Sequence, residues 1–383
     1  MACGFSDMKS LRPITLFLIA MTAATAAAAT PVYSVVDLGT LSGNYSLARG
    51  LNESGTVVGQ SLPQFSGPSH AVVFSNGGLQ DLGTLGGTTS FADSINDAGT
   101  ITGSAKITGD TADHAYAYSG GLMTDLGTLG GPNSYGRVIN NQGQIVGASD
   151  TNATTRHAFL YSNGIMQDLG TLGGVNSQGN SMNDAGQVVG NSEVTGSTNY
   201  HAFVYDGVSM VDIGTLGGTN SSAADINNAG QIVGYAYPVG SNLRHAFLYS
   251  NGIMQDIGTL GGTTSEAYAI NDAGVVVGSS NISGSIYHAF LYSSGNLLDL
   301  NDLIDPASGW LIRIAYDINE SGSIAAYGRQ SNGDYHALLL NVIPSSSTSI
   351  PEPAPLMLIG TGLLGLLHLR RFKYNGMRCD GNC

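Results

Sequence analysis

Residues 157–190 read HAFLYSNGIMQDLGTLGGVNSQGNSMNDAGQVVG, and three elements of this stretch recur in the same order along the chain. The Asp of Asp-Leu/Ile-Gly-Thr-Leu recurs seven times, with a degenerate last copy, at Asp37, Asp81, Asp125, Asp168, Asp212, Asp256 and Asp299. The Asn of Asn-x-x-Gly recurs at Asn52, Asn96, Asn140, Asn183, Asn227, Asn271 and Asn319. The His of His-Ala recurs at His70, His114, His157, His201, His245, His288 and His336. Successive Asp residues lie 43 or 44 residues apart, and a repeat of this length is typical of a propeller blade.

Each repeat contains four segments with the composition of β-strands. In the third repeat they are 134–140, 144–149, 157–162 and 165–169. Asn-Asn-Gln-Gly at 140–143 joins the first two and Ser-Asn-Gly at 162–164 joins the last two, and each turn ends in a Gly that accepts positive φ. Four short strands in each repeat predict a four-stranded propeller blade.

The two ends of the repeat region complete one another. Segment 33–38 has the pattern of the outermost strand of a blade, but the other three strands of that blade do not precede it. Segment 336–341 has the pattern of a third strand, but no outermost strand follows it. We predict that the two segments pair and close the ring, whereas an open solenoid would need capping repeats. The predicted fold class is all-β, a seven-bladed β-propeller of four-stranded blades over residues 32–342, closed by the N-terminal strand.

The repeat text resembles that of the HAF-repeat family of extracellular bacterial proteins over residues 32–342. The resemblance implies an exported propeller and assigns no chemistry to it. The seventh repeat departs from the pattern, because it carries an insertion within 299–310 (DLNDLIDPASGW) and has Ala326 where the other repeats have Gly. We expect Trp310, the single tryptophan, to plug the seventh blade.

The N-terminal residues 1–29 have the pattern of a signal peptide. Lys9 and Arg12 precede an apolar stretch over 14–24, and Ala-Ala-Ala at 27–29 offers a cleavage site. The sequence therefore predicts export.

The C-terminal region has the pattern of a sorting signal. A Ser/Thr-rich linker at 343–350 leads to Pro351-Glu352-Pro353, an apolar helix over 354–369 (APLMLIGTGLLGLLHL), Arg370-Arg371 and a polar tail at 375–383. The arrangement at 351–374 resembles the PEP-CTERM sorting signal of Gram-negative bacteria, although its tail is longer than usual. The resemblance implies a sorting protease of exosortase type as a partner, membrane contact through the helix before processing, and a final location at the cell envelope or outside the cell. An ordinary C-terminal membrane anchor is the alternative.

Composition excludes several classes of function. The chain has 27 acidic and 13 basic residues, and only seven of the basic residues lie within 32–342. Such an anionic domain repels phosphate backbones, so we expect no nucleic-acid partner. The three cysteines, Cys3, Cys379 and Cys383, lie outside the repeats, and neither they nor the Asn-x-x-Gly turns have the spacing of a metal site. We predict no metal and no cofactor.

The seven His and seven Asp residues are interpreted as structural, because a catalytic group is needed once and an architectural group is needed in every blade. His157 begins the third strand of its repeat and Asp168 ends the fourth, so a tight hairpin brings both to one end of the blade. We predict a His–Asp hydrogen bond there. Replacing His157 is then expected to lower the melting temperature rather than to abolish an activity.

A ligand site is predicted on the face that carries the variable loops and the crossovers between blades, because the opposite face carries only stereotyped turns. Within the central channel, the residues three positions before the recurring Asn vary, and those with binding chemistry are Arg49, Asp93, Arg137, Asn180, Tyr268 and Tyr316. These residue types hydrogen-bond hydroxyl groups and stack on sugar rings. Packing between blades around a solvated channel is the alternative interpretation.

The sequence favours an exported cell-surface or matrix protein without catalytic activity, which binds exopolysaccharide or another surface protein, and no catalytic residue is predicted. A purely structural spacer is a second hypothesis. A third is a secreted glycosidase or lyase with carboxylates in the channel, for which Asp93, Asp225, Glu266 and Asp317 are the non-repeated candidates. No nucleophile elbow, zinc motif or phosphate loop has a convincing context.

Overall fold

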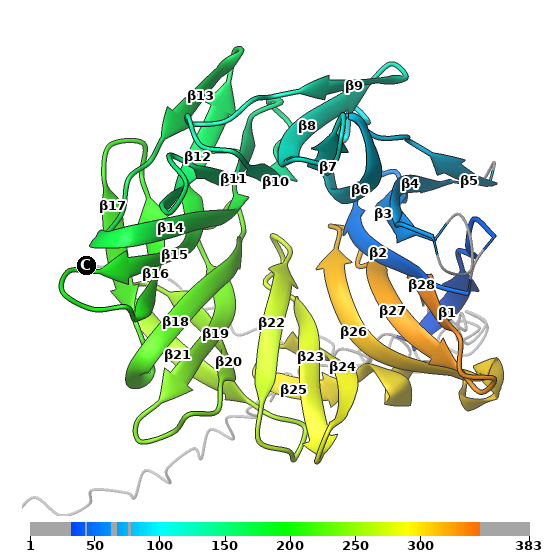
Figure 1. Cartoon of the computed structure of the whole chain (residues 1–383). Coiled ribbons are helices and arrows are strands. Elements are labelled where there is room, and N and C mark those ends of the chain that lie inside the picture. Colours follow the sequence, from blue (N-terminus) through cyan, green and yellow to red (C-terminus); the bar gives the residue numbers. More distant parts are fainter. Residues whose placement is uncertain (1–31, 43, 63–66, 76–77, 345–383) are drawn as a thin grey trace, which may run out of the picture.

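The computed structural model describes residues 32–42, 44–62, 67–75 and 78–344. The predicted signal peptide, the sorting signal, the polar tail and residues 345–350 of the linker lie outside these residues. The described chain forms seven antiparallel sheets of four strands each, arranged around a central axis (Figure 1). The predicted seven-bladed propeller is confirmed.

Six blades follow the chain in order, with the first strand innermost. Blades one to three are β2 (Ser46–Leu51), β3 (Val57–Ser61), β4 (His70–Ser75), β5 (Gly78–Asp81); β6 (Gly86–Ile95), β7 (Ile101–Ile107), β8 (Asp113–Ser119), β9 (Leu122–Asp125); and β10 (Ser134–Ile139), β11 (Ile145–Asp150), β12 (Arg156–Ser162), β13 (Ile165–Asp168). Blades four to six are β14 (Gly173–Met182), β15 (Val188–Val194), β16 (Tyr200–Tyr205), β17 (Met210–Gly214); β18 (Gly217–Ile226), β19 (Ile232–Pro238), β20 (His245–Ser250), β21 (Ile253–Gly258); and β22 (Ser265–Ile270), β23 (Val276–Ser283), β24 (Ile286–Ser293), β25 (Asn296–Asp299). The four strands expected in the third repeat are present, with ends that differ by a residue at most.

The hydrophobic core lies between blades rather than within them. One cluster joins Val146 and Ala158 of blade three to Met182, Val188 and Phe203 of blade four, and all five side chains are buried. The phenylalanine of the His-Ala-Phe element is fully buried in blades three to six. Each blade therefore needs both neighbours to remove its apolar faces from water.

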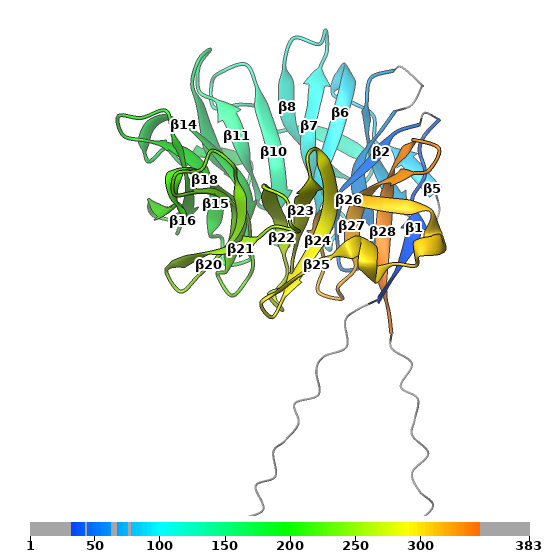
Figure 2. The same ribbon diagram turned by 90° about the horizontal axis from the view of Figure 1, so that it is seen from below.

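The seventh blade is assembled from both ends of the repeat region. It consists of β26 (Trp310–Ile318), β27 (Ile324–Gln330) and β28 (Tyr335–Ile343), with β1 (Val32–Asp37) as the outer strand. The antiparallel register of β1 with β28 runs from Val32 opposite Ile343 to Asp37 opposite Leu338. The two strands lie side by side in the edge-on view (Figure 2). The predicted closure by the N-terminal strand is confirmed.

The insertion of the seventh repeat forms two short 3₁₀ helices, η1 (Leu300–Leu303) and η2 (Pro306–Ser308). Leu300, Leu303 and Ile304 join the core of the seventh blade. Trp310 begins β26 and packs, partly buried, against the same core.

Replacement of Tyr33 by Ala is expected to lower the free energy of unfolding by about 3–5 kcal/mol, because this side chain, 2% exposed, leaves a cavity in the closing blade. Val32→Ala is the matched control, since Val32 in the same strand is 51% exposed and is expected to change stability by less than about 1 kcal/mol. Denaturant unfolding of the exported protein measures both values. Equal stability of the Tyr33→Ala variant and the wild type would show that β1 does not close the ring.

Candidate functional site

The propeller has two chemically different faces. The turn face carries the hairpins between the first and second strands and those between the third and fourth strands. The variable face carries the loops between the second and third strands and the crossovers between blades. In the edge-on view the strands run from one face to the other (Figure 2).

Six hydrogen bonds between neighbouring blades hold the turn face together. The Nδ2 group of the recurring Asn donates to the backbone oxygen of the recurring Asn in the next blade at 3.0–3.2 Å, from Asn52, Asn96, Asn183, Asn227, Asn271 and Asn319. The link from Asn319 to Asn52 crosses the joint that β1 closes. These seven turns are therefore committed to holding the blades in a ring.

An outer ring of acidic and amide side chains surrounds the asparagines. In six of the seven blades, the residue after the recurring Asn accepts a hydrogen bond at 2.7–3.0 Å from the equivalent backbone N–H of the preceding blade. These residues are Glu53, Asp97, Asn141, Asn228, Asp272 and Glu320. Asp184 occupies the same position in blade four and belongs to the same acidic rim. The mouth of the channel on this face is a polar pocket of about 340 Å³.

Every blade contains the expected His–Asp hydrogen bond. The Nδ1 atom of the recurring His lies 2.5–2.9 Å from the nearer oxygen of the recurring Asp in all seven pairs, including His336 with Asp37 from the opposite end of the chain. The same Asp also accepts a hydrogen bond from the backbone N–H two residues later, as Asp168 does from Gly170 at 2.8 Å. Gly170 needs to be Gly because its φ is +74°. The pair therefore fixes the start of the crossover to the next blade.

A recurring serine that the sequence argument missed completes this joint. Its hydroxyl donates to the carbonyl of the crossover Gly at 2.5–2.6 Å and accepts from the backbone N–H of the Ala in His-Ala at 2.8–2.9 Å, as Ser177 does with Gly170 and Ala158. The six copies are Ser46, Ser90, Ser134, Ser177, Ser221 and Ser265, and all are at most 2% exposed. Their fixed distance of nine residues from the recurring Asp was a visible signal.

The predicted channel residues all lie at a β-bulge. In every innermost strand the pairing with the second strand shifts around the residue three positions before the recurring Asn, as it does between Gly136 and Val138 around Arg137. A bulge leaves one residue out of the ladder and redirects its side chain. The same position is thus irregular in all seven blades, and it is also the position at which the side chain varies.

The structure brings these channel residues together as neighbours. Asp93 lies between two arginines, 3.7 Å from Arg49 and 3.9 Å from Arg137. The rings of Tyr268 and Tyr316 have centroids 5.4 Å apart, and the Arg49 guanidinium lies 5.3 Å from the centroid of Tyr316.

Asn180 donates to the backbone oxygen of Ala223 in the next blade at 2.7 Å. Asn180 thus contacts the neighbouring blade, as Arg49 and Arg137 do through Asp93.

Two further carboxylates lie in the channel wall near the turn face. Asp317 accepts hydrogen bonds from the backbone N–H groups of Leu51 and Ile318 at 2.7 and 2.8 Å. Burial and the charge of Asp225 raise the pKa of Asp317 to about 7. Burial also raises the pKa of Asp225, which accepts from Ser181 at 2.6 Å and from the backbone of Ile270 at 2.8 Å.

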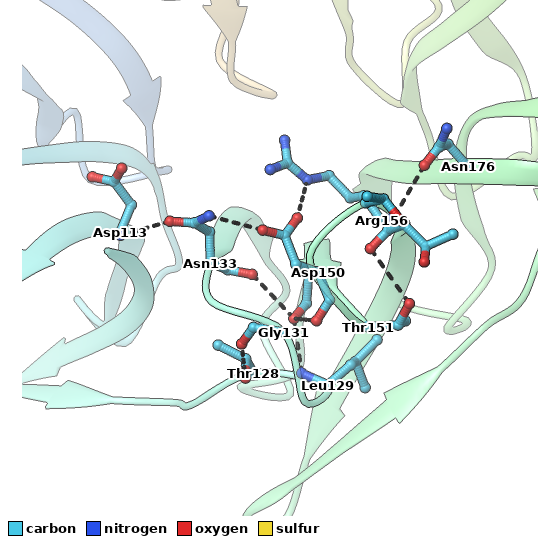
Figure 3. Close-up of polar contacts among 12 residues, drawn as sticks. Asp113, Thr128, Leu129, Gly131, Asn133, Asp150, Thr151, Arg156 and Asn176 are labelled. Carbon is cyan, nitrogen blue, oxygen red and sulfur yellow. Dashed lines mark hydrogen bonds and ion pairs between the residues drawn. The ribbon is translucent and has the colours of Figure 1, made fainter. Parts of the chain in front are cut away.

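A pocket of about 470 Å³ opens on the variable face between blades three and four. Its centre is Asp150, which lies 2.7 Å from the Nε atom of Arg156 and accepts from Asn133 at 2.8 Å (Figure 3). Burial alone would raise the pKa of Asp150, but the hydrogen bonds from Arg156 and Asn133 and the charge of Arg156 outweigh burial and lower it. Arg156 also lies over the ring of Tyr135, 4.7 Å from its centroid.

Hydrogen bonds also fix the side of this pocket that blade four provides. Asn176 accepts from the backbone N–H of Arg156 at 3.0 Å (Figure 3). Glu193 accepts from Asn176 and from the Tyr200 hydroxyl, each at 3.0 Å. Its pKa is lowered, chiefly by the hydrogen bond from Asn176. These residues lie on the predicted variable face, but no pattern in the sequence distinguishes them from their neighbours there.

The remaining candidate carboxylate, Glu266, lies 3.0 Å from Arg244 and accepts from the Tyr268 hydroxyl at 3.1 Å. Burial raises the pKa of Glu266, although the charge of Arg244 opposes the shift. Asp93, Asp225, Glu266 and Asp317 thus have different sets of partners. Within the described ranges, no group of three or more His, Cys, Asp or Glu side chains is placed to hold a metal ion.

The C-terminal region of the chain matches a known sorting motif. Residues 349–371 match the PEP-CTERM protein-sorting motif. The chain carries a PEP-CTERM sorting signal. It is therefore an exported protein directed to the cell envelope, and the signal implies processing by an exosortase. In the part of the chain that the structure describes, no helix has the length and apolar character needed to cross a membrane.

The propeller is similar in fold to solved structures and not in sequence. The β-propeller domain of the Trilobed protease from Pyrococcus furiosus, described as having an open velcro topology, has a TM-score of 0.51 at 10% identity, over 78% of this chain and 94% of that chain. TolB from Acinetobacter baumannii has a TM-score of 0.43 at 11% identity, over 75% of this chain and 63% of that chain. No curated protein sequence matches the chain significantly. The likeness to the propeller domain of the Trilobed protease concerns the fold alone.

Replacement of Ser177 by Ala is expected to lower the free energy of unfolding by about 1–3 kcal/mol, because the buried Ala158 N–H and Gly170 carbonyl lose their partner. The melting temperature measures the effect. Ser162→Ala, in a surface hairpin of the same repeat, is the matched control and is expected to change stability by less than about 0.5 kcal/mol. Equal effects of the two substitutions would contradict the role of Ser177 at the joint.

The raised pKa of Asp317 makes stability depend on pH. Between the ordinary value of 3.8 and about 7, the folded protein keeps a proton that the unfolded chain has released. Stability is therefore expected to fall as pH rises through this window, by up to about 1.4 kcal/mol per pH unit from this group. Unfolding of the Asp317→Asn variant between pH 4 and 8 tests the sign, because the variant lacks this titration. A wild type whose stability exceeds that of the variant more at pH 8 than at pH 5 would refute the assignment.

Proposed function

We propose that the chain is a non-catalytic binding module that cells export to their surface or extracellular matrix, and that it binds exopolysaccharide through its variable face. The observation that supports this proposal most directly is the pocket between blades three and four. A pocket of about 470 Å³ has the size of a small-ligand site, and such sites combine a few fixed polar groups with aromatic surface.

The chemistry of this pocket suits a saccharide. Asn133, Asp150, Arg156, Asn176 and Tyr200 line it, and they offer both donors and acceptors to hydroxyl groups. Most of these side chains are held by one another, so binding a ligand costs little additional ordering.

The attachment of the sorting signal supports the variable face as the side presented to ligands. Ile343 ends β28 beside the Asn319 turn, where Ser323 donates to Asn341 at 3.2 Å. Val32, the first residue of β1, pairs with Ile343. Both ends of the propeller thus lie at the turn face, and the sorting motif begins six residues after Ile343. While the signal holds the protein at the membrane, the variable face points away from it.

We favour binding without turnover over a secreted glycosidase or lyase. A glycosidase needs two carboxylates that share one substrate. Asp93 and Glu266 are paired with arginines, and Asp225 and Asp317 accept hydrogen bonds from the backbone of neighbouring blades. Each of these carboxylates therefore either balances the charge of an arginine or connects two neighbouring blades.

The test is binding of the exported protein to a panel of polysaccharides, followed by calorimetry with oligosaccharides of any polymer retained. Arg156→Gln is expected to weaken binding at least tenfold, about 1.4 kcal/mol, because the ligand loses a fixed donor. Glu53→Gln on the turn face is the control and is expected to bind as the wild type does.

Several results would count against the proposal. Polysaccharide breakdown that Glu266→Gln abolishes would favour the enzyme. Saturable binding of another surface protein, with no retention of any polysaccharide, would replace the ligand class. Unchanged binding by a stably folded Arg156→Gln variant would move the site away from this pocket.

A further inference from the structure

A cluster of three tyrosines and two arginines lies where blade seven meets blade one. The rings of Tyr327 and Tyr335 stack with centroids 5.2 Å apart and planes 12° apart, and Tyr45 meets Tyr327 edge-on at 6.0 Å. The guanidinium groups of Arg313 and Arg329 lie 6.0 and 5.7 Å from the centroid of Tyr335. Arg313 also donates to the Tyr335 hydroxyl at 3.2 Å.

The cluster opens on the variable face. Arg329 and Tyr335 are opposite one another in β27 and β28, at the end of the strands that the loop 330–334 connects. Tyr45 comes from the crossover that leads into blade one and forms a bridge with Tyr335. The Arg329 side chain is exposed and the other four are half-buried, so the group is accessible from solvent.

Arg313 and Arg329 differ from the other basic side chains of the described region in having no carboxylate partner there. The remaining five are paired: Arg49 and Arg137 with Asp93, Lys106 with Asp113, Arg156 with Asp150, and Arg244 with Glu266. The chain has a formal net charge of −14, so two arginines that make no ion pair are a local exception. Asp334 in the loop 330–334 accepts a hydrogen bond from Asn332 at 2.9 Å instead of pairing with them. The planar guanidinium fork is complementary to a carboxylate.

We propose that this cluster is a subsite for the carboxylate of an acidic saccharide, such as a uronic acid unit of an exopolysaccharide. The inference rests on the proposed function and adds the ligand class to it. The two guanidinium groups bind the carboxylate, and the tyrosine surface packs against the sugar ring.

The acidic rim of the turn face does not cancel this attraction. A strand of six residues separates the two faces by roughly 20 Å. Charges are screened over about 8 Å at physiological ionic strength. An acidic ligand at the variable face therefore meets mainly the charges of that face, among which Arg313 and Arg329 make no ion pair with the described carboxylates.

The test compares an oligogalacturonate with its methyl ester, which has the same backbone without the charge, by calorimetry on the full-length exported protein. The wild type is expected to bind the acid at least tenfold more tightly than the ester, and more weakly as NaCl rises from 50 to 500 mM. The double variant Arg313→Gln/Arg329→Gln is expected to bind the acid at least tenfold more weakly and the ester unchanged. Lys106→Gln removes one charge from the same face and is expected to behave as the wild type does.

Equal affinity of the wild type for acid and ester, or wild-type binding of the acid by the double variant, would overturn the subsite. The single variant Arg329→Gln keeps the test valid if the double variant does not fold, because this side chain is exposed and its contact with the Tyr335 ring lies at the surface. Loss of binding in Arg156→Gln together with wild-type binding in the double variant would retain the proposed function and reject the acidic subsite. Failure of every saccharide to bind would reject both.

Discussion

The pairing of β1 with β28 is the constraint on which the rest of the structure depends. Each core cluster spans two blades, so a blade without a neighbour exposes apolar surface on one side. The register of this pair places Asp37 beside His336 and allows Ser46 to accept from the Ala337 backbone N–H. The joint between the chain ends therefore has the same hydrogen bonds as the joints within the chain, and the core becomes continuous around the axis.

The joint between blades three and four is less regular than the others. Among the described residues, neither turn-face ring continues there: Asn140 donates to Gln144 in its own turn, and Gln142 donates to the backbone of Asp184 instead. The variable-face pocket with Asp150 and Arg156 opens at this same joint. The third repeat, like the sixth, is one residue shorter between its Asn and Asp elements than the other complete repeats, and in the third repeat this difference falls in the stretch that contains the Asp150–Arg156 loop.

The fold was predictable because the same pattern of strands and turns recurs in seven repeats of the sequence. Recurrence fixed the strands of the third repeat to within a residue and placed His157 near Asp168. The recurring serine was predictable in principle, since it stands at a constant distance from the Asp. The pocket was not, because the approach of Arg156 to Asp150 depends on a loop that no other repeat shares. Tyr45 and Tyr335 are 290 residues apart in sequence, and only ring closure brings them together.

Polar residues that recur in every blade have a structural role in this molecule, whereas residues that occur in one repeat are the candidates for binding. The repeated polar groups satisfy one another: His binds Asp, Ser bridges Gly and Ala, and Asn binds the next Asn. Such groups have little capacity left for a ligand, since a new partner would have to displace an existing one. Arginines that make no ion pair with a described carboxylate are found where a repeat departs from the common sequence, as at Arg313, which donates to the Tyr335 hydroxyl, and at Arg329. Because the turn face is constrained to be alike in every blade, the departures accumulate on the variable face, which is the face through which we propose that the protein binds its ligand.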